Sequence, residues 1–291
     1  MKKWIRVIVF LVILLLLVGR TYQILSWKDT TGDYLSVTQQ LYATPKDHID
    51  VVFAGSSHCY CGINPSVLWE EYGISAFDMA VSGQDKDSTY HGLVEVFKTQ
   101  SPKVVCVDAW GLFFEEHEDQ GNVYRNMLAL RTSGNSVELV QDYVPKEERG
   151  DFYLRWPIVH TRYAELTEYD FVQYEPSIYG RGFFPNYNVA VVEEPIATFS
   201  CKEVIPLSER NKAWIDDLNA LAKEHDATLM MVNAPMYMTE EGQALLNGAQ
   251  EYLEEQGIVF FDFNRLGKKI KLEPMNPYER RIIHAALSER E

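Results

Sequence analysis

The sequence has 291 residues, 46% of them apolar and 24% charged, and these values exclude collagen, a repeat array and an intrinsically disordered chain. Its net charge is −15, and beyond residue 28 the chain carries 22 basic against 42 acidic side chains. Because such a surface repels phosphate backbones, the composition predicts that nucleic acid is not a partner. The four cysteines form no CxxC pair and no nucleotide-binding motif is present, so we expect neither a metal site nor a cofactor.

The N-terminus has the composition of a membrane anchor. Residues 7–18 contain no polar side chain, and Lys2, Lys3 and Arg6 precede them. No pattern suited to signal-peptide cleavage follows, so we expect residues 1–27 to form a cytoplasmic tip and a retained transmembrane helix that contacts membrane lipid. The positive charge before the apolar run places the N-terminus in the cytoplasm and the main domain outside the cell membrane. A cleaved signal peptide is the alternative.

Beyond a predicted juxtamembrane linker over 28–48, short apolar runs alternate with amphipathic segments. The apolar runs are bounded by turn residues, as buried parallel strands are, and several of the amphipathic segments begin with helix-capping residues. This alternation predicts an α/β domain over 49–291, with a parallel sheet and helices on both faces. The expected strands are 49–55, 75–80, 103–108, 228–235 and 258–262, and the expected helices are 64–72, 88–100, 208–225 and 239–255.

Residues 111–206 interrupt this alternation and are rich in Tyr, Phe and Pro. We expect them to form an insertion with helices over 123–130 and 136–143 and a loop at about 175–190. The aromatic stretch 174–187 is either a packed surface loop or a lid or partner contact.

The strongest candidate for chemistry comes directly after the first expected strand, in the run Gly55-Ser56-Ser57-His58. A serine in a strand-to-helix turn has its hydroxyl at the carboxyl edge of a parallel sheet, where ligands of such sheets bind. Backbone N–H groups at the start of the next helix can face an oxyanion there. His58 is expected to be structural, because it adjoins Ser57 but points away from it along the turn.

The run from Val51 to His58, which reads VVFAGSSH, and the GINP of 62–65 resemble the first motif of the SGNH (GDSL-like) hydrolases and acyltransferases. The similarity is greatest to the membrane-anchored branch with polysaccharide O-acetylation and teichoic-acid D-alanyl transfer proteins. The resemblance implies a three-layer flavodoxin-like fold and a nucleophile at Ser57. The FDMAVSGQ of 77–84 resembles the second motif, which implies that Gly83 lends its N–H to the oxyanion.

Two family motifs are altered. The third expected strand ends Asp108-Ala109-Trp110-Gly111, without the family's asparagine. The family's last motif has an Asp three residues before its catalytic His, and in this sequence Arg281 stands three residues before His284, the candidate base. An arginine there disfavours the imidazolium that catalysis must form. The ending is either that of a truncated or frame-shifted product or that of a natural pseudoenzyme.

The resemblance implies a membrane-anchored extracytoplasmic serine esterase or acyltransferase that acts on acyl esters of cell-envelope polymers. The alternative is an inactive module of the same fold that binds envelope glycan, teichoic acid or a membrane acyltransferase partner. In either case the resemblance implies no cofactor.

Overall fold

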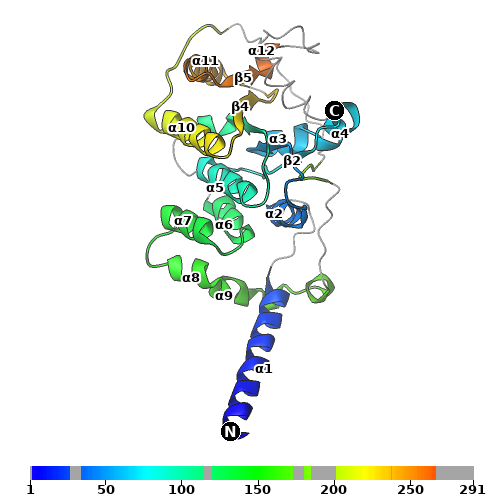
Figure 1. Cartoon of the computed structure of the whole chain (residues 1–291). Helices are drawn as coiled ribbons and strands as arrows, with labels where there is room; N and C mark the ends of the chain where they lie inside the picture. The colour runs from blue at the N-terminus through cyan, green and yellow to red at the C-terminus, as the bar shows by residue number, and fades with distance from the viewer. Residues whose placement is uncertain are drawn as a thin grey trace.

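The computed structural model describes residues 2–26, 34–114, 120–172, 180–184, 201–236 and 238–266 (Figure 1). Five parallel strands form one sheet in the order β2-β1-β3-β4-β5. They are β1 (Val51–Ala54), β2 (Ala76–Asp78), β3 (Val104–Asp108), β4 (Thr228–Asn233) and β5 (Val259–Asp262). The predicted α/β class, its parallel sheet and the positions of its five strands are confirmed.

The chain goes from β1 to β2 on one side of it and then crosses back to β3 on the other side of β1. The strand order therefore reverses between β1 and β3. Every residue of β3 is buried, as expected of the central strand of a parallel sheet. In β1 and β5 buried residues alternate with half-buried ones, so one sheet face carries the main core. Ligands of such sheets bind at the carboxyl ends of the strands beside the reversal point.

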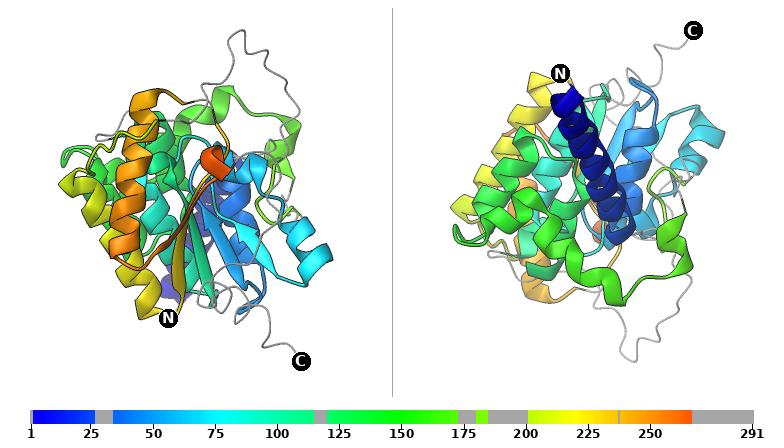
Figure 2. Two further views of the ribbon diagram at one scale, coloured as in Figure 1. Left: turned by 90° about the horizontal axis from the view of Figure 1, so that it is seen from above. Right: turned by 90° about the horizontal axis from the view of Figure 1, so that it is seen from below.

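The helices that connect the strands are capped by the residues that the sequence indicates. Asn64, Asp85, Ser208 and Thr239 each accept a hydrogen bond from a backbone N–H of the helix that they precede. These helices are α4 (Pro65–Tyr72), α5 (Lys86–Phe97), α10 (Glu209–Glu224) and α11 (Glu240–Glu255), with the short α3 (Ser57–Gly62) and α12 (Phe263–Leu266) at strand ends. Figure 2 shows α10 and α11 on one side of the sheet and α4 on the other.

Between β3 and β4 the chain forms a mostly helical segment with a small core of its own. Its elements are η1 (Ala109–Phe113), α6 (Gln120–Ala129), α7 (Gly134–Tyr143), α8 (Arg149–Leu154), α9 (Trp156–Val159), η2 (His160–Ala164) and η3 (Glu168–Phe171). The second core consists of Met127, Leu130, Leu139, Val140, Val144 and Phe152. The two helices predicted here are confirmed as α6 and α7. Of the aromatic stretch 174–187, only residues 180–184 are described, and Arg181 O accepts a hydrogen bond from Asp78 N at the edge of β2.

Two helices precede the sheet, α1 (Lys2–Leu25) and α2 (Tyr34–Ala43). An 18-residue stretch within Lys3–Leu25 has a mean hydropathy of 2.3, and α1 is long and apolar enough to cross a membrane. It extends away from the body of the molecule, and only its last turns contact the helical segment (Figure 1).

Candidate functional site

The turn after β1 meets the end of β3 at the point where the strand order reverses. Gly55 has a φ of +140°, and a Cβ built there would lie 2.4 Å from the Cβ of Asp108. Only glycine permits both this backbone conformation and this close approach. As a result Ser56, the first residue after Gly55, lies directly against the carboxyl end of β3.

Ser56 is the centre of a buried hydrogen-bond cluster with Asp108 and His58. Its hydroxyl donates to Asp108 Oδ2 at 2.7 Å and lies 2.9 Å from His58 Nδ1. The Ser56 hydroxyl also accepts a hydrogen bond from the backbone N–H of His58, so Ser56 is the N-cap of α3. Asp108 accepts a further bond from the Trp110 N–H, at 3.2 Å, and thereby caps η1. The cluster ties the turn after β1 to the end of β3.

His58 forms the outer side of this cluster. Its side chain is 27% exposed, against 2% for Asp108, and its ring lies 4.8 Å from the Trp110 ring. A ligand that approaches from solvent therefore meets the His58 imidazole and the Trp110 indole before it meets the carboxylate. The His58 ring folds back onto the Ser56 hydroxyl. The expectation that it points away from Ser57 stays a prediction.

The structure puts Ser57 in the first turn of α3, half-buried and next to the cluster. Within the described part of the chain, the serine hydroxyl that is hydrogen-bonded to His58 and Asp108 is that of Ser56 and not that of Ser57. Gly83 lies in a turn with φ +59°, and Val81 N donates to Gly55 O at 3.1 Å, which brings that turn to the same sheet edge. The roles of Ser57 as the nucleophile and of Gly83 in binding the oxyanion stay predictions. The third candidate, His284, lies outside the described residues.

Two more buried ionisable groups, Asp78 and Cys59, lie near Asp108. Asp78, at the end of β2, is fully buried, and burial raises its pKa well above the usual range, with nearby Asp108 adding to the effect. Burial likewise raises the pKa of Asp108, against the hydrogen bond from Ser56 and the nearby His58, which lower it. Burial also raises the pKa of the Cys59 thiol, which favours its protonated form.

Sequence reasoning treated Asp108 only as the place where a family asparagine is missing. In the structure it is the acceptor that holds the Ser56 hydroxyl. The sequence feature that indicates this role is an acidic residue at the end of an otherwise apolar strand. Parallel sheets bind their ligands at the carboxyl ends of the strands beside the reversal point, so a polar residue there is a candidate for function.

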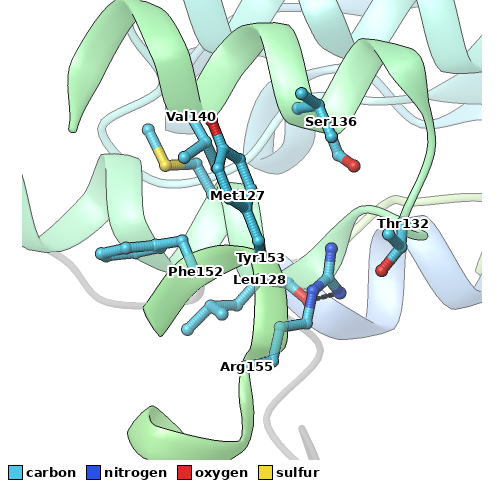
Figure 3. Close-up of a pocket in the computed structure, with 9 residues that line it drawn as sticks. Met127, Leu128, Thr132, Ser136, Val140, Phe152, Tyr153 and Arg155 are labelled. Carbon is cyan, nitrogen blue, oxygen red and sulfur yellow. Dashed lines mark hydrogen bonds between the residues drawn. The ribbon is translucent and has the colours of Figure 1, made fainter. Parts of the chain in front are cut away.

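A separate pocket lies among α6, α7 and α8, away from the sheet edge (Figure 3). It is lined by Met127, Leu128, Thr132, Ser136, Val137, Val140, Phe152, Tyr153 and Arg155. Arg155 Nη1 donates to Leu128 O at 3.2 Å, so the guanidinium closes one side of the pocket. This lining contains no acid, histidine or cysteine that could act on a ligand.

Within the described ranges no three His, Cys, Asp or Glu side chains are grouped as a metal site would require. The four cysteines all lie in the described part of the chain, where none of them forms a disulfide, and Cys59 and Cys106 are buried.

Comparison with known families finds a similarity at the C-terminal end of the chain. Residues 250–291 match the R-3-H domain, and these 42 residues are a small part of the 291. The match begins in the last turns of α11 and includes β5 and α12. No curated protein matches the chain.

This similarity corrects the expectations drawn from the SGNH resemblance. The matched family is the R-3-H domain and not SGNH or GDSL, so the assignments as a hydrolase, as an acyltransferase and as an inactive module of that fold are wrong. The envelope glycan, teichoic acid and acyltransferase partners lose their basis with it. His284, expected to be a catalytic base, falls inside the matched segment. The VVFAGSSH run is short, and any buried strand that leads into a capped helix can produce it.

The exclusion of nucleic acid is also wrong, because domains of the matched family bind nucleic acids. The physical reason is that a net charge averages over the whole chain. Residues 1–264 carry 20 basic against 38 acidic side chains, whereas residues 265–291 carry seven basic against four acidic. A short basic segment can attract phosphate locally although the body of the protein is acidic.

Proposed function

We propose that this protein binds single-stranded nucleic acid through residues 250–291. The observation that carries the proposal is the similarity of this segment to the R-3-H domain, a domain of nucleic-acid-binding type. The similarity names no sequence preference, so the proposal is limited to the class of ligand.

The distribution of charge supports the proposal. Lys268, Lys269 and Lys271 lie within four consecutive positions, and Arg280 and Arg281 follow in the same segment. Basic side chains at this density neutralise phosphates and release counterions, which is the main source of affinity in non-specific binding. The acidic body repels the rest of a long strand, so we expect a short binding site.

The described start of the segment lies at an accessible place. β5 pairs only with β4 among the described strands, so it is an edge of the sheet. Phe263 in α12 follows it and is 37% exposed, and Arg265 is exposed two residues later. An exposed aromatic ring beside a cationic side chain is the combination on which bases of a single strand stack.

The test is fluorescence anisotropy with the detergent-solubilised full chain and labelled single-stranded RNA and DNA oligonucleotides, over a range of salt concentrations. We expect binding that weakens steeply with salt. Replacing Lys268, Lys269 and Lys271 together by Gln is expected to weaken binding at low salt by about tenfold or more. It should also reduce the slope of log affinity against log salt by about 2, since each phosphate contact to a single strand contributes about 0.7.

The matched control replaces three lysines outside the segment, Lys202, Lys212 and Lys223, by Gln. It removes the same charge and is expected to leave affinity and salt slope unchanged. An unmodified chain that binds neither oligonucleotide would overturn the proposal. Equal losses in the two triple variants would show that binding follows overall charge and not residues 250–291.

We also propose that α1 anchors the protein in a membrane as a retained helix, with its N-terminus in the cytoplasm. Its apolar length supports this proposal, as does the exposure of an 18-residue stretch of the helix, none of which is buried inside the protein. Its last turn is bonded into the body, because Arg162 donates to the carbonyl oxygens of Leu25 and Ser26. A helix that is cut off as a signal peptide would leave this buried guanidinium without those acceptors.

A further inference from the structure

The helical segment from α8 to η3 curves around the end of α1. Figure 1 shows α9 beside the last turns of α1 and α8 beyond α9, and the view from below in Figure 2 shows the segment passing around the helix. The helix α1 contacts α9, η2 and η3, so the two views and the contacts agree. Any membrane that α1 crosses therefore has its surface next to this segment.

Polar bonds fix the direction of α1 relative to the segment. Arg162 Nη1 donates to Leu25 O at 2.9 Å and to Ser26 O at 2.7 Å, and Arg162 Nη2 pairs with Asp170 at 2.9 Å. Lower on the helix, Arg20 donates to Phe171 O at 3.2 Å. The Tyr22 and Trp156 rings stack at 6.1 Å. The junction is thus a set of specific contacts from α9, η2 and η3 and not a free linker.

The same segment exposes a group of large apolar and aromatic side chains, which we call the collar. Their exposed fractions are between 54% and 72%. The collar consists of Leu154, Tyr163, Tyr169, Phe171 and Val172. Single exposed apolar residues are normal on a protein surface, but a group of them within 19 residues of sequence, next to the end of a long apolar helix, marks an interaction site.

We propose that the collar lies in the interfacial zone of the bilayer that α1 crosses, with phospholipid as its partner. Tyrosine and other aromatic rings favour this zone because they have an apolar body and a polar or polarisable part. Residues 149–172 carry three arginines against four acidic side chains, so attraction to anionic lipid is not what holds them there. The contact is expected to form equally well on neutral phosphatidylcholine. This inference rests on the proposed anchoring by α1 and is independent of the proposed nucleic-acid binding.

The test uses the full chain in phosphatidylcholine nanodiscs, with one nitroxide label at a time. The labels replace Leu154, Tyr163 or Phe171 in a background with Cys61→Ser and Cys201→Ser, because Cys59 and Cys106 are buried. The matched control is Trp69→Cys on α4, since Trp69 is 57% exposed and lies far from α1. Ile13→Cys reports on α1 itself. Each label is read by its collisions with oxygen, which concentrates in lipid, and with a nickel chelate, which stays in water.

We expect the collar labels to have a nickel accessibility at least threefold lower than the label at position 69, with oxygen-to-nickel ratios between those of positions 69 and 13. Adding anionic lipid is expected to leave these ratios unchanged. If the collar labels match position 69 while position 13 is in lipid, the collar proposal is overturned and the anchor stands. If position 13 is also in water, the anchor itself fails. A collar that reaches lipid only when anionic lipid is added overturns the proposed apolar contact.

Discussion

Asp78 shows how a single buried carboxyl group affects the stability of this fold. Its Oδ1 accepts a hydrogen bond from Ala80 N at 2.9 Å, whereas Oδ2 has no partner within the described residues. Burial raises the pKa of Asp78 above that of the unfolded chain, so the folded state binds this proton more tightly. The stabilising effect is complete below the ordinary carboxyl pKa of about 4 and is lost as the pH rises toward the raised pKa.

Replacing Asp78 by Asn should therefore flatten the dependence of stability on pH. The amide is neutral, has nearly the same shape and keeps an oxygen for the Ala80 N–H. We expect the free energy of unfolding, measured in urea at pH 5 and pH 8, to fall with pH less in the variant than in the unmodified protein. Asp226→Asn, an exposed substitution at a position with φ +55°, is the control that should retain the full pH dependence. Equal slopes for Asp78→Asn and the unmodified chain would contradict this account.

At the scale of residues, the sequence predicted the neighbourhood of the candidate site better than its contacts. A glycine and two serines after an apolar strand correctly indicated a turn at the carboxyl edge of the sheet. The sequence could not show that Ser56, and not Ser57, contacts Asp108, because that hydrogen bond joins residues 52 positions apart. Only the strand order brings those two positions together.

At the scale of elements, strands and helices were predictable where burial is periodic and the ends carry capping residues. All five strands lie where the apolar runs indicated them. The short helices from α8 to η3 were not predicted. Their apolar side chains follow neither the 3.6-residue period of a half-buried helix nor the two-residue period of a strand. The reason is that several of them face outward, as the exposure of Leu154 and Tyr163 shows.

The packing of α11 against residues 201–207, which precede α10, can be tested at Gly248, where this segment crosses the helix. A Cβ at Gly248 would lie 1.9 Å from Ile205 O, and Ile205 N donates to Ala244 O one turn earlier. Gly248→Ala should lower the free energy of unfolding by about 2 kcal/mol, since backbone must move to make room. Gly134→Ala, in the first turn of α7 with nothing within 4 Å, should raise it by about 0.5 kcal/mol.

Urea unfolding of the two alanine variants beside the unmodified chain checks this pair. Both substitutions add the same methyl group to a helix, so any difference between them reports on the crossing. Effects of the same sign and size would mean that residues 201–207 do not press on α11 in solution.

At the scale of the whole molecule, the net charge conceals a difference between the body of the protein and its C-terminal segment. The net charge of −15 reflects the body, in which acidic side chains outnumber basic ones. In the C-terminal segment 265–291 basic side chains outnumber acidic ones. The apolar N-terminal run was recognisable from composition alone. Its attachment to the body was not, since Arg162 and Leu25 are 137 positions apart.

The junction between α1 and the body depends on Arg162, and this dependence can be measured. Arg162→Ala removes two donors to the end of α1 and leaves Asp170, which is 3% exposed, without its cation. We expect a loss of about 3 kcal/mol in the free energy of unfolding, together with faster hydrogen exchange of the amides of residues 156–172. The control Arg210→Ala breaks a surface pair of 3.9 Å with Asp87 and should change stability by no more than about 0.5 kcal/mol.

The double variant Arg162→Ala with Asp170→Asn separates two causes of that loss, because the amide is uncharged and keeps an oxygen for the Thr167 N–H, which Asp170 Oδ2 accepts at 2.8 Å. If the cost comes from the unpaired carboxylate, the second substitution restores part of the stability, because no buried charge remains. If the cost comes from the lost bonds to Leu25 and Ser26, the double variant is no more stable than Arg162→Ala alone, and exchange at the end of α1 stays fast. Unchanged stability and exchange in Arg162→Ala would contradict a fixed junction, and α1 would then be joined to the body by a free linker.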